Sequence, residues 1–271
     1  MLVSSESVKA QSYDFTWKKT SVKAREAVVT PSNASNVKQS MGQVRWDTYY
    51  APNGKVYYGG ATAKAASIIL AAQDRMAPIK RLVAHSAKEM VKHSPECELS
   101  NWAVDFIMSA TEELTGKHVD MGVTNFGGIR VDMPEGDVLE DDLRSMFPFK
   151  NALCLVSLKG SKIREILENM AATSFQAIGG VRVVVQDRKL ISAEIGGQPI
   201  DDDKVYNLAT IDFLLDGGDR LHLGNDAIEM TNTGVYIIDA LLPYVEKLEA
   251  EGKMIDAEID GRVTILPSAK K

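Results

Sequence analysis

The stretch Ser94-Pro-Glu-Cys-Glu-Leu-Ser-Asn-Trp-Ala-Val-Asp-Phe-Ile-Met-Ser-Ala-Thr-Glu-Glu-Leu-Thr-Gly116 predicts the clearest helix of the chain. Ser94 and Pro95 are typical of a helix start, because serine caps free N–H groups and proline fits the first turn. Apolar residues then recur along one helical face: Leu99, Trp102, Ala103, Phe106, Ile107, Ala110 and Leu114. A strand is predicted over 119–123, and it leads directly into the glycine-rich loop Asn125-Phe-Gly-Gly-Ile-Arg130.

Further strands come in adjacent runs rather than alternating regularly with helices. Residues 152–158 form an almost unbroken apolar run, which is typical of a strand buried on both faces. A hairpin is predicted over 181–195 and another strand over 205–211, and an apolar helix containing Pro243 follows. The sequence therefore predicts an α+β fold of mixed β-sheets with packed helices.

The composition is that of an ordinary globular protein: 271 residues, 45% hydrophobic and 25% charged. A formal net charge of −6 argues against binding to duplex nucleic acid, which needs a surplus of Lys and Arg. Two cysteines, Cys97 and Cys154, are too few for a disulfide framework or a cysteine-based zinc site. No apolar run approaches the roughly 20 residues that span a bilayer, so no transmembrane segment is expected.

Two regions are predicted along the chain. Residues 1–60 form an N-terminal extension with a β-hairpin, in which 44–50 and 55–58 flank a turn containing Asn53-Gly54. Residues 61–271 form the main domain. The segment Val8-Lys-Ala-Gln11 is similar to the small-residue end of an export leader, and an ordinary frayed terminus explains it equally well.

The sequence shows no complete catalytic apparatus. The four histidines, His85, His93, His118 and His222, are scattered, and no pair has the spacing of metal ligands on a helix. A nucleophile elbow and a phosphate-binding P-loop are also absent from the sequence. We therefore predict no catalytic residue and no metal site on this chain.

Three segments at strand ends carry candidate binding residues. Loop 125–130 has two glycines that allow close approach of a ligand, and Arg130 suits a phosphate; a tight turn followed by a surface arginine is the simpler alternative. Segment 146–151 holds two phenylalanines around a proline, a pattern that core packing also explains. Segment 212–219 combines aspartates with a diglycine, which also suits a plain turn.

Together these segments describe a nucleoside site. Two phenylalanines can enclose a flat base, with each face contributing on the order of 1–3 kcal/mol by analogy with base stacking. An aspartate can bind the ribose hydroxyls, while Asn125 and Arg130 contact a polar edge or a phosphate.

The chain resembles the C-terminal, substrate-specificity domain of the 5′-nucleotidase family from about residue 66 to its end. Five collinear stretches carry the resemblance: Leu99-Ser-Asn-Trp-Ala-Val-Asp105, Asn125-Phe-Gly-Gly-Ile-Arg130, Phe147-Pro-Phe-Lys-Asn151, Asp212-Phe-Leu-Leu-Asp-Gly-Gly-Asp219 and Asn232-Thr-Gly234. The resemblance implies an α+β domain that binds a nucleotide.

The resemblance also implies the site residues. The base would lie between Phe149 and Phe213, and Asp219 would bind the ribose. In the glycine-rich loop the substrate contacts would be Asn125, Gly127, Gly128 and Arg130.

Four departures from the family pattern concern the same segments. Phe126, Lys150 and Arg220 each stand where the family usually has glycine, and Lys92-His93 stands where it has a phosphate-binding arginine. Phe147, Trp102 and Phe106 are expected in the core, and Asp105 is expected to form structural hydrogen bonds.

Full-length members of this family carry a metallophosphoesterase domain, and its histidine-bearing metal motifs do not occur in these 271 residues. We therefore expect a specificity subunit of a split 5′-nucleotidase, with no cofactor of its own and divalent metals on a separate metallophosphoesterase chain. The alternatives are a non-catalytic nucleoside-binding protein for scavenging or sensing, and an interaction protein that has lost the pocket. The resemblance implies a periplasmic, cell-surface or secreted location.

Overall fold

The computed structural model describes residues 37–268, so the leader-like segment 8–11 lies outside the described residues. The chain divides into two compact units, Met1–Asp74 and Arg75–Lys271, which are described separately. Helix α2, Gly60–Met76, begins at residue 60, where the sequence placed a domain boundary. That boundary stays a prediction.

The first unit contains a small antiparallel sheet beside α2. Its elements before α2 are α1 Val37–Met41, β1 Gln43–Arg45, β2 Thr48–Tyr50 and β3 Val56–Tyr58. Strands β2 and β3 pair with Tyr50 opposite Val56, which is the hairpin predicted around Asn53-Gly54. Gly54 has a φ of +80°, a conformation that glycine adopts without steric cost.

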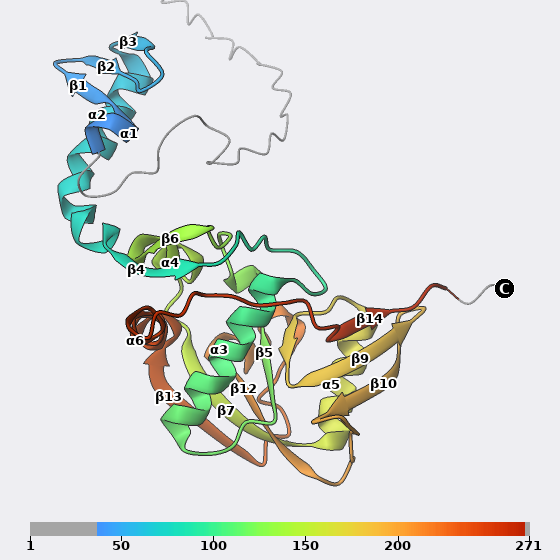
Figure 1. The fold of residues 1–271 in the computed structure, drawn as a ribbon. Helices are drawn as coiled ribbons and strands as arrows, with labels where there is room; N and C mark the ends of the chain where they lie inside the picture. The colour runs from blue at the N-terminus through green and yellow to red at the C-terminus, as the bar shows by residue number, and fades with distance from the viewer. Residues whose placement is uncertain (1–36, 269–271) are drawn as a thin grey trace, which may run out of the picture. The chain divides into compact units, whose positions relative to one another are not determined.

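The second unit is built on a five-stranded mixed sheet with the order β13-β7-β12-β5-β8 (Figure 1). Its strands are β5 Met121–Thr124, β7 Ala152–Lys159, β8 Ala177–Gly179, β12 Val205–Ile211 and β13 Glu229–Tyr236. Strand β12 runs parallel to β5 and antiparallel to β7. All residues of β7 except the last are buried, as the apolar run 152–158 predicted.

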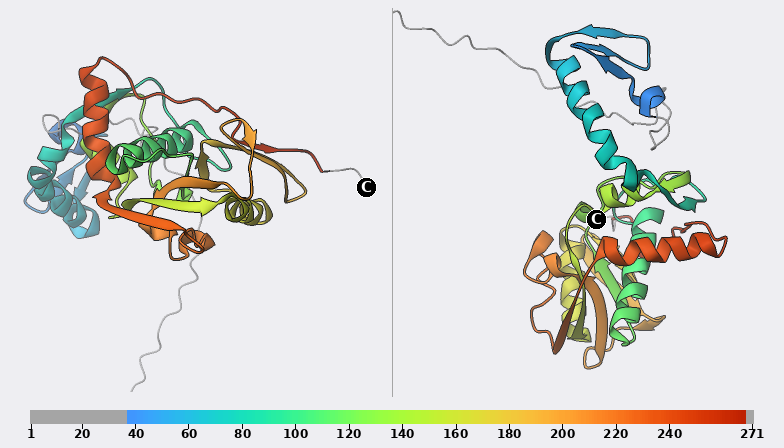
Figure 2. Two further views of the ribbon diagram at one scale, coloured as in Figure 1. Left: turned by 90° about the horizontal axis from the view of Figure 1, so that it is seen from below. Right: turned by 90° about the vertical axis from the view of Figure 1, so that its left-hand side faces the viewer.

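Helix α3, Glu98–Thr115, lies along one face of this sheet (Figures 1 and 2). It begins three residues later than the sequence predicted, with Glu98 rather than Pro95 as its first residue. Cys97 is the N-cap: its Sγ accepts a hydrogen bond from the Ser100 backbone N–H, and the Ser100 hydroxyl oxygen accepts one from the Cys97 backbone N–H. This reciprocal capping satisfies two N–H groups that the first turn leaves unpaired, so the helix starts after Cys97 rather than after Ser94.

A second sheet has the order β11-β10-β9-β14 and packs against α5. The elements are α5 Gly160–Ala172, β9 Val181–Gln186, β10 Lys189–Ile195, β11 Gln198–Pro199 and β14 Val263–Ile265. Strands β9 and β10 form the hairpin predicted over 181–195.

A two-stranded sheet and two helices complete this unit. They are β4 Leu82–Ser86, β6 Gly136–Leu139, α4 Glu140–Met146 and α6 Ile237–Ala250, and the short 3-10 helix η1, Ala77–Lys80, precedes β4. Helix α6 packs on β4 and β13, and Figure 2 shows it from two directions. The fold is therefore α+β with mixed sheets, as predicted.

Candidate functional site

The sheet register brings the three candidate segments to one edge. Strands β5 and β12 are parallel, so the loops that follow Thr124 and Ile211 leave the sheet on the same side. Strand β7 is antiparallel to β12, and Leu153 near its start pairs with Ile211. The segment that precedes β7 therefore reaches the sheet at this same edge.

Asn125 and Asp219 join two of these segments. The Asn125 side-chain amide Nδ2 donates a hydrogen bond of 2.6 Å to Asp219 Oδ2. Asn125 is buried, while Asp219 is exposed. The other amide atom, Asn125 Oδ1, is buried and has no hydrogen-bond partner within the structure. A buried acceptor of this kind is costly unless a ligand or water donates to it.

The two glycines of the loop leave room around Asn125. A Cβ at Gly128 would lie 2.7 Å from Asn125 Oδ1, and a Cβ at Gly127 would lie 3.3 Å from Asn125 Nδ2. A side chain at either position would therefore crowd the Asn125 amide, and glycine lets the amide keep its position. The 3-10 turn η2, Phe126–Gly128, carries both.

Lys92 and Gln176, which lie outside this loop in sequence, bind its backbone. The Lys92 ammonium donates to the backbone carbonyls of Phe126, at 3.4 Å, and Ile129, at 2.5 Å, and Gln176 Oε1 accepts from the Phe126 N–H at 2.9 Å. The sequence placed Lys92 only where the family has a phosphate-binding arginine. Its role as a clamp on the loop was missed, because nothing in the local sequence connects it to residues 34 and 37 positions away.

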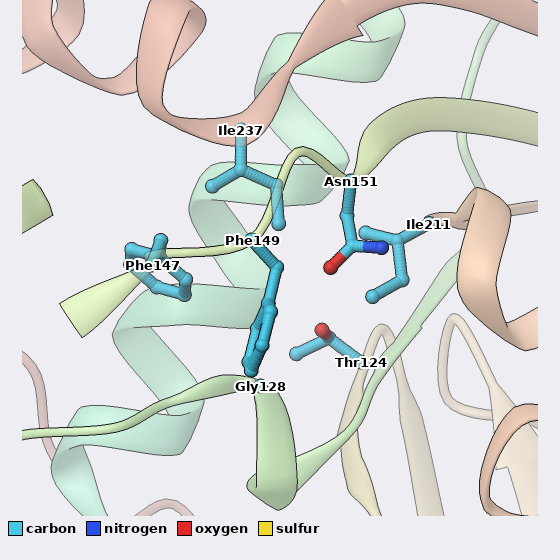
Figure 3. A pocket seen from close by; sticks show the side chains of 7 residues that line it. All are labelled: Thr124, Gly128, Phe147, Phe149, Asn151, Ile211 and Ile237. Carbon is cyan, nitrogen blue, oxygen red and sulfur yellow. The ribbon is translucent and has the colours of Figure 1, made fainter. Parts of the chain in front are cut away.

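Phe149 lies in the segment before β7, beside Arg130. The Arg130 guanidinium carbon is 5.8 Å from the centre of the Phe149 ring, and Arg130 Nη1 donates to the Gly127 carbonyl at 3.3 Å. Figure 3 shows the ring extending from its loop toward Gly128. A cavity of about 10 Å³ between this ring and Asn151 has room for about one water molecule.

Phe213 lies in η3, Asp212–Leu214, directly after β12. Asp212 Oδ1 accepts hydrogen bonds from the Phe213 N–H at 2.7 Å and from Asn151 Nδ2 at 3.1 Å. A Cβ at Gly218 would lie 2.6 Å from Phe213 Cδ1, so the ring packs directly on that glycine. Asp212 thus links the segment before β7 to the Phe213 loop, a role that the sequence analysis did not assign.

An open cleft of about 720 Å³ lies along the Phe213 loop. Its lining residues are Asn151, Asp212, Phe213, Asp216, Gly217, Gly218 and Asp219. Phe149 and Phe213 are each 48% exposed, which is high for phenylalanine. The two rings line different hollows that share Asn151, and they make no ring contact with each other. Their face-to-face arrangement around a base stays a prediction.

The backbone around Asp219 is strained. Asp219, Arg220 and His222 have φ values of +48°, +65° and +47°, in the left-handed region that residues with a Cβ rarely adopt. Such conformations cost on the order of 1–3 kcal/mol each and cluster at functional sites. The strain therefore points to the same loop as the candidate residues do.

The residues expected outside the site are placed as predicted. Phe147, Trp102 and Phe106 are buried in the core. Asp105 forms a bidentate ion pair with Arg262, with both N–O distances at 2.8 Å, which confirms its structural role.

In the part of the chain that the structure describes, the side chains that commonly bind metals do not form a cluster. No set of three or more His, Cys, Asp or Glu side chains between residues 37 and 268 is placed to hold a metal ion. Cys97 and Cys154 are both buried with free thiols, and burial, together with the charge of Asp212, raises the pKa of Cys154 to about 12. Over the same residues, no helix has the length and apolar character needed to cross a membrane.

The fold and the loop motifs define a family. Residues 78–226 match the model of the 5′-nucleotidase C-terminal domain, and this match covers more than half of the chain. The chain belongs to the family of 5′-nucleotidase C-terminal domains.

Several relatives share this domain. Protein UshA of Yersinia enterocolitica is 29% identical over 146 residues, which are 52% of this chain and 26% of that protein. The 5′-nucleotidase of Rattus norvegicus is 26% identical over 194 residues, which are 62% of this chain and 33% of that protein. The chain thus spans about a quarter to a third of the length of these relatives.

A solved structure has the same fold. The 5′-nucleotidase precursor from Thermus thermophilus superposes with a TM-score of 0.68 at 23% identity, over 81% of this chain and 45% of that one. This similarity confirms the α+β fold.

Proposed function

We propose that this chain binds the nucleoside part of a nucleoside 5′-monophosphate and presents its phosphate to a separate di-metal phosphoesterase. One observation carries the proposal: three family motifs meet at one sheet edge and leave Phe149 and Phe213 half exposed there. An exposed aromatic pair beside a hydrogen-bonded Asn–Asp pair suits a ligand with a flat ring and vicinal hydroxyls.

Each residue has a distinct role in this proposal. The base stacks between Phe149 and Phe213, and the Asp219 carboxylate accepts hydrogen bonds from the ribose hydroxyls. Asn125 Oδ1, which is buried without a partner, accepts a hydrogen bond from the ligand. Arg130 is held beside the Phe149 ring and directs its remaining N–H groups to a polar edge or a phosphate.

The chain contributes orientation rather than a nucleophile. Holding the nucleoside in one position converts phosphate transfer into an effectively unimolecular step at the metals of the partner. Support comes from the names of the relatives, which include 5′-nucleotidases. We also propose a periplasmic, cell-surface or secreted location, on the basis of the family resemblance.

Nucleotide binding is tested by titration calorimetry with AMP and adenosine. We expect Phe149→Ala and Phe213→Ala each to weaken both ligands by about five- to a hundredfold, the size of one lost stacking face. Ile191→Ala, which removes another exposed apolar side chain, is the matched control and leaves affinity unchanged. Unchanged affinity in both phenylalanine variants would contradict the site.

Hydrolysis is tested by phosphate release from AMP with divalent metals. The proposal expects release only when a metallophosphoesterase is added, and expects Phe213→Ala to reduce that release. Binding of AMP with no release in any combination favours a nucleoside-binding protein used for scavenging or sensing. Robust release by the chain alone would overturn the division of labour.

A further inference from the structure

A second hollow of about 340 Å³ adjoins the candidate nucleotide site. Its polar lining comes from the end of α5, the segment before β8 and the loop after β12: Asn169, Thr173, Ser174, Gln176, Asp219 and Arg220. Asp219 also lines the 720 Å³ cleft, so its carboxylate stands at the boundary between the two hollows. The proposed nucleoside contacts leave the second hollow unused.

Arg220 occupies a backbone position that suits glycine. Its φ of +65° lies in the left-handed region, which is unfavourable for any residue with a Cβ. The arginine side chain is exposed and forms no ion pair or side-chain hydrogen bond with the residues that the structure describes. Its guanidinium therefore brings a positive charge to the rim of the hollow that no side chain between residues 37 and 268 pairs with.

Other groups in the hollow can also donate hydrogen bonds. Gln176 Oε1 is engaged by the Phe126 N–H, so the amide nitrogen of Gln176 remains to donate. At the C-terminal end of α5 the Arg188 guanidinium donates to the Ala172 carbonyl, which offsets part of the negative end of the helix dipole. One oxygen of Asp219 is likewise bound by Asn125. Among the residues that the structure describes, an anion in the hollow would thus meet the Gln176 amide nitrogen and the Arg220 guanidinium, beside the Asp219 carboxylate.

We infer that this hollow is a subsite for a phosphate group on the ribose 2′ or 3′ hydroxyl, bound by Arg220. The inference rests on the proposed function, because it needs Asp219 to hold the ribose hydroxyls. A group attached to the 2′ or 3′ oxygen of the ribose would extend beyond Asp219 into the second hollow. The planar, permanently charged fork of arginine suits the oxygens of a phosphate.

The test compares adenosine, 5′-AMP, 2′-AMP and 3′-AMP by titration calorimetry. We expect 2′-AMP or 3′-AMP to bind at least about tenfold more tightly than adenosine, as for one charge-assisted contact. Arg220→Ala removes this advantage and leaves the affinity for adenosine within about twofold, and Arg220→Lys restores part of it. Lys189→Ala, which deletes an exposed cation on β10, is the control for net charge.

The outcomes separate the two proposals. Equal affinity for adenosine and its 2′- and 3′-phosphates overturns the subsite alone, as does an equal loss for all ligands in Arg220→Ala. No binding of any nucleoside overturns the proposed function and the subsite with it. Arg220→Gly provides a fold control, because relief of the left-handed strain keeps its melting temperature at or above that of the parent chain.

Discussion

Asn125 Nδ2 lies 2.6 Å from Asp219 Oδ2, so a hydrogen bond joins the end of β5 to the loop after β12 across 94 positions of sequence. The bond fixes the carboxylate proposed to bind ribose and leaves Asn125 Oδ1 as a buried acceptor without a partner. Both polar atoms of one amide thus lie in the candidate site, one bonded to Asp219 and the other proposed to accept from the ligand.

The Asn125–Asp219 pair should show energetic coupling. We expect Asn125→Ala and Asp219→Ala each to lower the free energy of unfolding by about 1 kcal/mol, the net contribution of one hydrogen bond. The double variant should lose clearly less than the sum, because both single variants remove the same bond. Urea denaturation of the three variants measures the coupling. Strictly additive losses would show that the bond contributes nothing.

Gly218 should be essential for the position of Phe213. A Cβ at Gly218 would lie 2.2 Å from the Phe213 carbonyl oxygen and 2.6 Å from its ring, so Gly218→Ala must displace the phenylalanine. We expect about tenfold weaker AMP binding and a loss of about 1–3 kcal/mol of stability, the cost typical of overpacking.

The control for Gly218 is Gly252→Ala. Gly252 has a φ of +67°, and no atom lies within 4 Å of its built Cβ. That variant should lose stability through backbone strain alone and keep its affinity for AMP. Similar affinity losses in both variants would show that the effect is not local to Phe213.

Lys92→Met should distinguish a loop clamp from a phosphate ligand. Because the Lys92 ammonium donates to the Phe126 and Ile129 carbonyls, its loss should disturb the whole loop and weaken adenosine and AMP by the same factor. We expect that factor to be on the order of tenfold. Lys88→Met, which removes a lysine paired with Asp256 and Glu258, is the matched control. A loss confined to AMP would assign Lys92 to the phosphate instead.

His85 should make stability depend on pH. The hydrogen bond with Glu249 on α6 raises the pKa of His85, and the charge of Asp137 on β6 acts in the same direction. A raised folded-state pKa stabilises the protein fully below the unfolded value of about 6.5, and this contribution is lost as pH rises through the folded value. The melting temperature should therefore fall as the pH rises from about 6.5 through the folded-state pKa of His85.

His85→Gln tests the origin of this dependence. Glutamine does not titrate, so the fall in melting temperature above about pH 6.5 should flatten. Glu249→Gln should flatten it as well, because the carboxylate that raises the pKa is gone. Thermal unfolding measured from about pH 5.5 to 8.5 provides the comparison, and parallel curves for all three proteins would contradict the assignment.

Much of the fold could be predicted from sequence, because its signals are local. The apolar run 152–158 predicted a strand buried on both faces, and β7 is one. The hairpin over 181–195 was also visible, because the turn Gln186-Asp187-Arg188 separates two strand-like runs. The start of α3 could not be predicted from the local sequence. Whether Ser94 or Cys97 is the N-cap depends on the Ser100 hydroxyl and on the contacts of the preceding segment.

The sequence by itself determined the fold class, the family and the residue types available for binding, because periodicity and motif spacing are written along the chain. Only the tertiary structure decided which of those residues meet. The parallel pairing of β5 with β12 and the antiparallel pairing of β7 bring three distant loops to one edge, and Lys92 and Asp212 hold them there. Such contacts depend on strand register and on side chains far apart in sequence, and no local pattern encodes them.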